Sequence, residues 1–549
     1  MSAKEVEATA KPSFMEKFFA GIERVGNKVP SPPLMFSYLI IGVIVLSAVL
    51  SWIGVSVTEE IAVPIVDGKV PDYYEDVSIP SYPGGDEDVH YEIVEQTTSI
   101  RSLLTVDGIR FIFSSFVTNF AGFSALAVTL IAMMGAGAAE VAGLIGALIR
   151  KLVKVAPGGL IAYLIVLIGV IASVASDAGY LILIPLGGVA FLAVGRHPLA
   201  GIAAGFGGVA AVFMANFIPT PTDAMLVEIT NEALASTGMA PISITADYYF
   251  QIVAAALLTV VVGLVVSKVV EPRLGKYNPD DAGDSEHAHA ADAIDPVLEA
   301  KGLKRAGIAA LIVLAIVLLA TIPNGAPLRD PETNAIIGQT PFMQSLLFIV
   351  MIFFFVPGVA YGTGVGKYKN ANDVIAAVVQ TFAGLGGLIF MLLMISQFIA
   401  YFNYSNIPPV LATWLATLLG SANIGPVPLL IGFTLVIVLL DFVITGALPK
   451  WAIFAPIFVP LFVQLGVPAQ TVFSAYRIGD SPVNTLTPLM VYFPVIVTFG
   501  QRYVKKFGVG SLVALMLPIA VAVLVVWLLL LVVWFLTGLP LGPGYPVRF

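Results

Sequence analysis

The sequence predicts an all-α polytopic membrane protein with nine transmembrane helices, two re-entrant helical hairpins and inverted repeats. The first observation behind this prediction is the composition: 58% of the 549 residues are hydrophobic, 11% are charged and the mean hydropathy is +0.95. Soluble proteins carry about 25% charged residues. The second is that apolar segments of roughly 20 residues, long enough to cross a bilayer, recur along the whole chain. The third is a pair of longer apolar stretches, each polar in its middle.

The same composition excludes several classes of protein. The net charge of −8 and the lack of a basic face argue against a nucleic-acid-binding protein. The chain has no cysteine, and its four histidines are scattered without metal-binding spacing, so we expect no cofactor. Neither an H-E-x-x-H run nor a histidine at membrane depth is present, and the sequence therefore predicts that the protein is not an enzyme.

Nine apolar segments are candidate transmembrane spans. They are residues 34–55, 118–150, 198–220, 246–270, 305–322, 343–360, 376–402, 468–497 and 509–537. Two further stretches, 160–195 and 429–466, are longer than one span and are centred on Ser176-Asp177-Ala178-Gly179 and on Thr445 to Lys450. Each could cross twice. A polar centre broken by Gly or Pro favours a re-entrant hairpin, because such backbone is tolerated at membrane depth only inside protein or beside water.

The distribution of Lys and Arg predicts the orientation. Most of them fall on one side of the membrane if the N-terminus is cytoplasmic and the C-terminus is outside, which satisfies the positive-inside rule. The predicted parts are a cytoplasmic N-terminal segment (1–33), a first half with four spans and hairpin 160–195 (34–270), a cytoplasmic linker (271–304), a second half with five spans and hairpin 429–466 (305–537) and a C-terminal tail (538–549). The acidic loop 56–100 is expected to form a small solvated cap outside.

The two halves contain similar motifs in the same order. Tyr180-Leu-Ile-Leu-Ile-Pro185 resembles Trp451-Ala-Ile-Phe-Ala-Pro456, and upstream Phe120-Ala-Gly-Phe123 resembles Phe382-Ala-Gly-Leu385. Downstream, Asn216-Phe-Ile-Pro-Thr-Pro221 resembles Asn484-Thr-Leu-Thr-Pro488. The two hairpins enter from opposite sides, so the repeats are inverted. Inverted repeats with broken helices are typical of secondary transporters, whose site lies near the midplane between the halves.

Ionisable residues at membrane depth mark the candidate site, since each costs at least about 2.5–3.5 kcal/mol there. Arg477 and Asp480 lie one helical turn apart, and one interpretation is a structural pair that neutralises itself. The other is that Asp480, with Asn484 and Thr485 at the helix break, binds Na⁺, because hard cations prefer oxygen ligands. Asn216 is the counterpart in the first half.

The hairpins supply four further candidates, which are Asp177, Tyr180, Lys450 and Trp451. A buried carboxylate with a raised pKa can carry a proton, and Asp177 is the best candidate for that role. Lys450 either binds an anion or extends toward water. Tyr180 and Trp451 either stack on an aromatic substrate or are structural. The sequence leaves the roles of Glu140 and Asp441 open.

Six motifs together resemble the AbgT family, the p-aminobenzoyl-glutamate transporters. They are Glu23-Arg-Val-Gly-Asn-Lys28, Met133-Met-Gly-Ala-Gly137 with Glu140, Ser176-Asp-Ala-Gly-Tyr180, Gly195-Arg-His-Pro-Leu-Ala-Gly201, Lys450-Trp-Ala-Ile-Phe-Ala-Pro456 and Tyr476-Arg-Ile-Gly-Asp-Ser-Pro-Val-Asn484. The resemblance runs from about residue 20 to 535. It implies nine transmembrane helices with two re-entrant hairpins, a homodimer in the bacterial inner membrane, and a place in the superfamily of ion-coupled elevator transporters.

The resemblance also implies a function. The expected function is secondary active transport of p-aminobenzoyl-glutamate or a related aromatic carboxylate, coupled to H⁺ or Na⁺. The alternative is a proton-motive-force-driven exporter of sulfonamide antimetabolites, and a channel is a remote alternative. The matching family residues are Asp177, Trp451, Pro468, Arg477, Asp480 and Pro488. Lys450 and Arg477 could bind the carboxylates and Trp451 the ring. The family tends to have a serine three residues before this tryptophan, where this chain has Leu448.

Overall fold

The computed structural model describes residues 32–64, 91–154, 158–172, 179–235, 237–279, 295–336, 340–421 and 425–549. Within these residues, 8 helices are long and apolar enough to cross a membrane. They are Pro33–Ile53, Val106–Ala142, Tyr248–Leu274, Pro296–Thr321, Leu346–Gly364, Gly386–Tyr404, Ala447–Gln464 and Val509–Thr537. This confirms a polytopic helical membrane protein, while the count of nine spans and the re-entrant course of the hairpins remain predictions.

The helices of the first half come before residue 275. They are α2 (Pro32–Ile53), α3 (Val106–Ala121), α4 (Ser124–Ala142), α5 (Leu144–Lys154), η2 (Gly158–Leu160), α6 (Ile161–Ala172), η4 (Gly179–Leu183), α7 (Ile184–Ala193), α8 (Pro198–Phe206), η5 (Gly207–Ala211), α9 (Pro221–Leu234), α10 (Tyr248–Val265), η6 (Val266–Val270) and α11 (Glu271–Leu274). The arms of the first predicted hairpin are therefore α6 and α7 with η4.

The second half contains the remaining helices. They are α12 (Pro296–Thr321), α13 (Pro341–Gln344), α14 (Leu346–Gly364), α15 (Ala371–Gly384), α16 (Gly386–Tyr404), α17 (Ile407–Ser421), α18 (Pro426–Asp441), α19 (Ala447–Gln464), α20 (Ala469–Asp480), η8 (Pro482–Thr485), α21 (Phe493–Gln501) and α22 (Val509–Thr537). The arms of the second predicted hairpin are α18 and α19.

The repeated motifs occupy equivalent places in the two halves. Phe120-Ala-Gly-Phe123 lies at the break between α3 and α4, and Phe382-Ala-Gly-Leu385 lies at the break between α15 and α16. After each second hairpin arm, a glycine with left-handed backbone ends the helix: Gly195 has φ +74° and Gly466 has φ +77°. Such a conformation favours glycine at a helix C-terminus. The next helix in each half, α8 or α20, then stops part-way.

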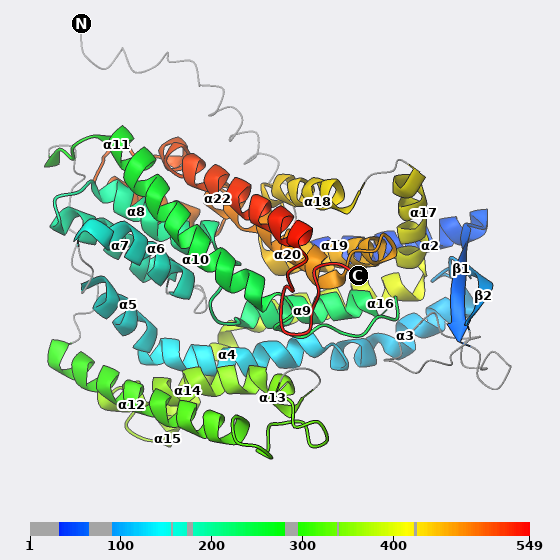
Figure 1. Ribbon diagram of the computed structural model, residues 1–549, viewed down its shortest axis with the longest axis horizontal. Coiled ribbons are helices and arrows are strands. Elements are labelled where there is room, and N and C mark those ends of the chain that lie inside the picture. The colour runs from blue at the N-terminus through cyan, green and yellow to red at the C-terminus, as the bar shows by residue number, and fades with distance from the viewer. Residues whose placement is uncertain are drawn as a thin grey trace, which may run out of the picture.

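Figure 1 shows how the two sets of elements are arranged. Helices α6, α7, α8 and α10 gather at one end and α17 lies toward the other, with α9, α18, α19 and α20 between them. Helices α12, α14 and α15 lie along one side, where α14 and α15 pack on α4. The C-terminal tail returns to the middle of the molecule, where the backbone carbonyls of Pro546 and Val547 accept hydrogen bonds of 2.7 Å from the side chains of Gln470 and Thr471.

Several boundaries differ from the sequence-based expectation: the span expected at 376–402 is divided between α15 and α16, the helix expected at 198–220 ends at Ala211, and three further differences have local causes. The fold was predicted as all-α, but the two ends of the loop 56–100 form an antiparallel pair, β1 (Ser56–Pro64) and β2 (Tyr91–Ser99), because both are rich in β-branched residues. Residues 65–90 lie outside the described residues, and the solvated cap remains a prediction. The span expected at 118–150 begins at Val106 and ends at Ala142, where Gly143 has φ +90°. The span expected at 305–322 already begins at Pro296, because Asp295 caps it; of the expected linker 271–304, residues 280–294 are not described.

Candidate functional site

The candidate site is built around α20, a helix whose residues are all buried. The helix ends at Asp480 because Pro482 follows, and proline has no N–H to continue the helical hydrogen bonds. In the first half, η5 likewise ends at Ala211. The two breaks meet, since the backbone N–H of Met214 donates to Ser481 Oγ at 3.2 Å. The halves therefore contact each other where both predicted broken spans lose their helical backbone.

Lys450, on the first turns of α19, is the centre of one buried ion cluster. Its ammonium lies 2.8 Å from Asp480 Oδ1 and also pairs with Asp441 Oδ1 at the end of α18. The side chains of Lys450 and Asp441 are 0% exposed and that of Asp480 is 2% exposed. Tyr476 contributes a hydroxyl 3.2 Å from Asp480 Oδ1, while Asp441 Oδ2 is buried without a hydrogen-bond partner. One cation is thus shared by two carboxylates in the interior.

Arg477 is the centre of a second buried ion cluster. Its Nη1 donates to Asp223 Oδ1 at 2.6 Å and to the carbonyl of Met214 at 3.2 Å. Its Nε lies 3.0 Å from Asp247 Oδ2, close enough for an ion pair but not aligned for a hydrogen bond. The guanidinium carbon lies 4.3 Å from the centroid of the Phe473 ring, a cation–π contact. Arg477 thereby connects α20 to two elements of the first half.

Additional hydrogen bonds hold the carboxylates of this second cluster. Asp223 Oδ2 accepts from the backbone N–H of Thr220 at 2.7 Å, as part of the capping box at the start of α9. Asp247 Oδ2 accepts from Gln251 Nε2 at 2.7 Å and from Ser474 Oγ at 3.4 Å. Both carboxylates are consequently fixed by neighbours other than the cation.

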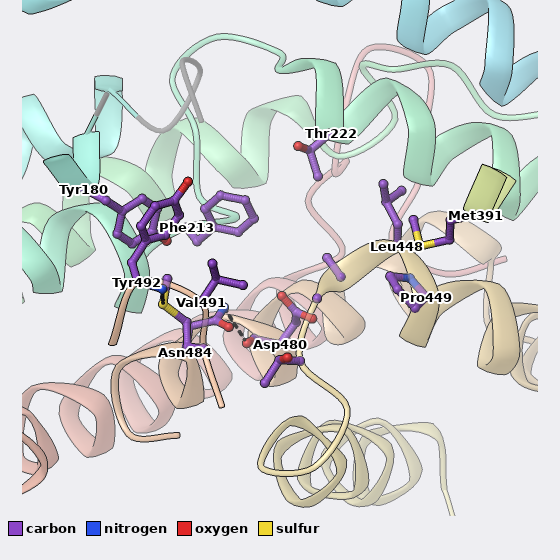
Figure 2. A pocket seen from close by; sticks show the side chains of 14 residues that line it. Tyr180, Phe213, Thr222, Met391, Leu448, Pro449, Asp480, Asn484, Val491 and Tyr492 are labelled. Atoms are coloured by element: carbon purple, nitrogen blue, oxygen red, sulfur yellow. Dashed lines mark hydrogen bonds between the residues drawn. The ribbon is translucent and has the colours of Figure 1, made fainter. Parts of the chain in front are cut away.

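A cavity of about 420 Å³ lies beside the Lys450 cluster. It is lined by Tyr180, Phe213, Thr222, Met391, Thr445 to Pro449, Asp480, Asn484 and Met490 to Tyr492. Figure 2 shows Tyr180, Tyr492 and Phe213 gathered on one side of the cavity and Leu448, Pro449 and Met391 on another, with Asp480 and Asn484 between these groups. The rings of Tyr180 and Tyr492 stack with their centroids 4.5 Å apart. Asp480 is the only charged residue among these lining residues.

The structure brings three of the predicted site residues together at this cavity, namely Tyr180, Asp480 and Asn484. Asn484 donates its amide to the carbonyl of Asp480 at 3.1 Å, which holds it next to the helix break. Leu448, which stands where the family tends to have serine, also lines the cavity. Asp177 lies outside the described residues.

The other predicted site residues within the described part of the chain do not line this cavity. Trp451 is 0% exposed, with its indole N–H donating to Thr230 Oγ1 at 2.9 Å and its ring centroid 4.4 Å from that of Tyr476. The remaining residues are Lys450, Arg477, Pro468, Thr485 and Asn216, which are buried, and Pro488, which is half-buried. In this conformation, none of these side chains is among those that line the cavity.

One pairing predicted from the sequence is wrong. Arg477 and Asp480 were interpreted as a possible self-neutralising pair, but Arg477 pairs with Asp223 and Asp247, and Asp480 pairs with Lys450. Asp480 therefore pairs with α19, the second arm of the predicted hairpin 429–466, and not with the arginine of its own helix. Sequence reasoning missed Asp223 and Asp247. The only local signal for Asp223 is the capping-box spacing Thr220-Pro-Thr-Asp223.

A Na⁺ site at Asp480 and Asn484 remains a prediction. In the part of the chain that the structure describes, no group of three or more His, Cys, Asp or Glu side chains is arranged to hold a metal ion. Asp480 Oδ1 faces Lys450, and the side-chain amide of Asn484 donates to a carbonyl. A bound Na⁺ would therefore take Asp480 together with carbonyl and hydroxyl oxygens of the break.

The chain matches the model of the AbgT putative transporter family over residues 17–549. It belongs to the AbgT family. A curated relative from Escherichia coli, the p-aminobenzoyl-glutamate transport protein, is 33% identical over 535 residues, which are 96% of this chain and 97% of the relative. This AbgT protein is thus a membrane transporter by family, as the resemblance of its motifs predicted.

Two solved structures are similar to this AbgT protein. The Alcanivorax borkumensis YdaH transporter, described as having an unusual topology, matches with a TM-score of 0.81 and 35% identity over 94% of this chain and 100% of that structure. Neisseria gonorrhoeae MtrF, described as illuminating a class of antimetabolite efflux pumps, matches with a TM-score of 0.83 and 32% identity over 96% of this chain and 100% of that structure. The family fold therefore extends over nearly the whole chain.

Proposed function

We propose that this AbgT protein is a secondary active transporter that moves p-aminobenzoyl-glutamate or a related aromatic carboxylate across a bacterial inner membrane, coupled to H⁺ or Na⁺. The proposal includes nine spans, two re-entrant hairpins in inverted repeats, and a homodimer with a cytoplasmic N-terminus and an external C-terminus. It includes no cofactor and no enzymatic step. The name of the E. coli relative supports the substrate class.

One observation carries the coupling part of the proposal: Lys450 is shared by two carboxylates, and one of them, Asp480, lies at the cavity wall. With both carboxylates ionised, the cluster has a net charge of −1, which is unfavourable in a low-dielectric interior. A proton or Na⁺ that binds Asp480 from the cavity neutralises the cluster and leaves Lys450 paired with Asp441. The cluster therefore has a different net charge with the ion bound than without it. An ion that binds one conformation of the transporter more tightly than the other shifts the equilibrium between the two conformations.

The cavity wall also offers contacts for an aromatic carboxylate. Tyr180, Tyr492 and Leu448 supply aromatic and apolar surface for the ring. The start of α19 faces the cavity, and its N-cap residue, Gly446, makes no side-chain capping bond. The free N–H groups of Ala447 and Leu448 at the start of this 18-residue helix can therefore donate hydrogen bonds to a carboxylate.

The direct test is a flux measurement with the full chain in proteoliposomes. Labelled p-aminobenzoyl-glutamate is supplied under a Na⁺ gradient and, separately, under a pH gradient. Flux that follows Na⁺ supports the ion site at Asp480 and Asn484, and flux that follows only the pH gradient supports a proton on a carboxylate such as Asp480 or Asp177. If the melting curve shows that the protein is folded and neither gradient drives flux, the proposed substrate is contradicted.

Export of sulfonamide antimetabolites is the second candidate, and one feature of the cavity favours it. Among the described lining residues there is no cation, because Lys450 and Arg477 are buried and do not line it. A sulfonamide has an aminobenzoyl-like ring without the glutamate and needs less positive charge. If this candidate is correct, a sulfonamide inhibits flux of labelled aminobenzoyl-glutamate and is itself moved under a pH gradient; if only aminobenzoyl-glutamate competes, it is wrong.

Leu448→Ser tests which ligand class the cavity prefers. The serine hydroxyl can donate to a carboxylate or carbonyl, an interaction of about 0.5–1.5 kcal/mol, which is roughly two- to tenfold in affinity. We expect the apparent affinity for aminobenzoyl-glutamate to rise by that factor, and the affinity for a sulfonamide to stay the same or fall because apolar surface is lost. Competition assays on the two proteins check this, and Leu448→Met controls for a change of shape alone.

A further inference from the structure

A second cavity, of about 570 Å³, lies where two of the long apolar helices end. It is lined by residues of the loop at α8, of the end of α10–α11, and of the segment from Val504 into the start of α22. Figure 1 shows α11 and the beginning of α22 close together at one end of the molecule. The candidate spans Tyr248–Leu274 and Val509–Thr537 reach this cavity with one terminus each, and we therefore expect it at the boundary between the bilayer and water.

The polar end of this cavity is positively charged. Arg273, Lys276 and Lys506 line it, and all three side chains are exposed. No carboxylate is among the described lining residues, and within the described part of the chain the three cations take part in no ion pair. The neighbouring Arg196, by contrast, is paired with Glu271. The start of α22, with Ser511 facing the cavity, adds the positive end of a 29-residue helix.

Beyond Ser511, the lining residues on α22 are apolar and follow one face of the helix. Ser511, Ala514, Leu515 and Pro518 line the cavity at spacings of three and four residues, which places them on one side of the helix. Leu274 and Val270, at the end of the other span, add further apolar lining. A free phosphate ion would use only the charged end. A phosphate group attached to acyl chains would use both the charged end and the apolar wall.

We propose that this cavity binds the phosphate headgroup of an anionic phospholipid, with an acyl chain along the 511–518 face of α22. Basic residues commonly flank membrane spans on the cytoplasmic side. Here, cations from two separate segments line one cavity whose other lining residues are largely apolar. Basic pockets between transmembrane helices bind anionic headgroups in this way. The predicted topology places this end of both spans on the cytoplasmic side. The proposal does not depend on which substrate is transported.

The test uses the purified full chain in detergent and follows its melting midpoint as lipid is added. The probes are phosphatidylglycerol, phosphatidylcholine of the same chain length, and inorganic phosphate. We expect phosphatidylglycerol to raise the midpoint, with phosphatidylcholine and phosphate having little effect. The triple variant Arg273→Gln, Lys276→Gln and Lys506→Gln should melt normally without lipid, because these side chains are exposed, but should need at least about tenfold more phosphatidylglycerol for the same shift.

A matched variant separates this site from general charge effects. Lys304→Gln, Lys367→Gln and Lys369→Gln removes three exposed lysines that line neither cavity, and its response to phosphatidylglycerol should be that of the unmodified protein. Equal shifts from both lipids, an equal shift from phosphate, or equal losses in both triple variants would each overturn the proposal. The readout is stability, so its failure is distinct from a failure of the transport assay.

Discussion

The two buried ion clusters of this AbgT protein have the same composition and different placements. Each contains one cation and two aspartates. The Arg477 cluster joins the halves, since Arg477 belongs to the second half whereas Asp223 and Asp247 belong to the first. The Lys450 cluster lies within the second half, and one of its carboxylates reaches the cavity. The comparison indicates that the first cluster holds the structure together and the second is available to respond to a ligand.

The choice of cation agrees with this difference. Arg477 offers a planar fork that binds Asp223, Met214 and Asp247 in different directions, as suits a permanent junction. Lys450 is a compact charge on a flexible stem, which can move between partners. Each cluster keeps a buried atom without a hydrogen bond, Asp441 Oδ2 in one and Arg477 Nε in the other, but only in the Lys450 cluster is that atom an acceptor that a proton or a cation could use. Buried polar groups without partners are costly, and they are often retained for function.

The largest expected effect comes from Arg477→Met. The change leaves Asp223 and Asp247 buried without their cation, and removal of one partner from a buried ion pair costs about 3–5 kcal/mol. We expect a strongly lowered melting midpoint and poor recovery of monodisperse protein. Arg477→Lys keeps the positive charge but loses the planar guanidinium group. Its melting midpoint should therefore lie between those of Arg477→Met and the unmodified protein. A normal melting curve for Arg477→Met would show that this cluster does not hold the halves together.

A smaller effect is expected from Lys450→Met. This change also leaves two carboxylates, but Asp480 can be hydrated or protonated from the cavity, so the loss should be only about 1–3 kcal/mol. Adding Asp441→Asn removes the carboxylate farther from the cavity and should recover part of the stability. Melting curves of the two single variants and the double variant form a cycle that measures the coupling. An additive cycle would contradict the arrangement of Lys450 between the two aspartates.

The smallest effect is expected from Ser474→Ala. This hydroxyl is an accessory partner of Asp247 at 3.4 Å, and it also lies 2.9 Å from the carbonyl of Gln470. Its loss should cost about 1 kcal/mol of stability and leave flux unchanged, because Asp247 retains Gln251 and Arg477. A large fall in flux without a change in melting would mean that the Arg477 cluster takes part in transport directly.

The fold could be predicted from sequence wherever local signals determine it. Residues 509–537 were predicted as a span and form α22 over the same residues, since an uninterrupted apolar run has few alternatives. The break after Asp480 followed from Pro482. The strands at 56–64 and 91–99 were missed because an isolated pair of strands in a polar loop has a weak signal, which depends on the partner strand.

The site could be predicted as a set of residues but not as a set of contacts. Tyr180, Asp480 and Asn484 do meet at one cavity, because polar residues at membrane depth usually face a cavity or each other. The partners of Arg477 are 254 and 230 residues away in the chain, and the contact of Trp451 with Thr230 spans 221 residues. No local pattern encodes pairs at such separations. Only the packing of the halves determines them.

One measurement tests the central claim most directly: gradient-driven uptake of labelled p-aminobenzoyl-glutamate by Asp480→Asn and by Asp247→Asn. The two substitutions make the same chemical change at buried carboxylates that each pair with a cation, but only Asp480 lines the cavity. We predict at least about a tenfold loss of uptake for Asp480→Asn with a nearly unchanged melting midpoint, and nearly unchanged uptake for Asp247→Asn. Normal uptake by Asp480→Asn, or equal losses in both variants, would contradict the account.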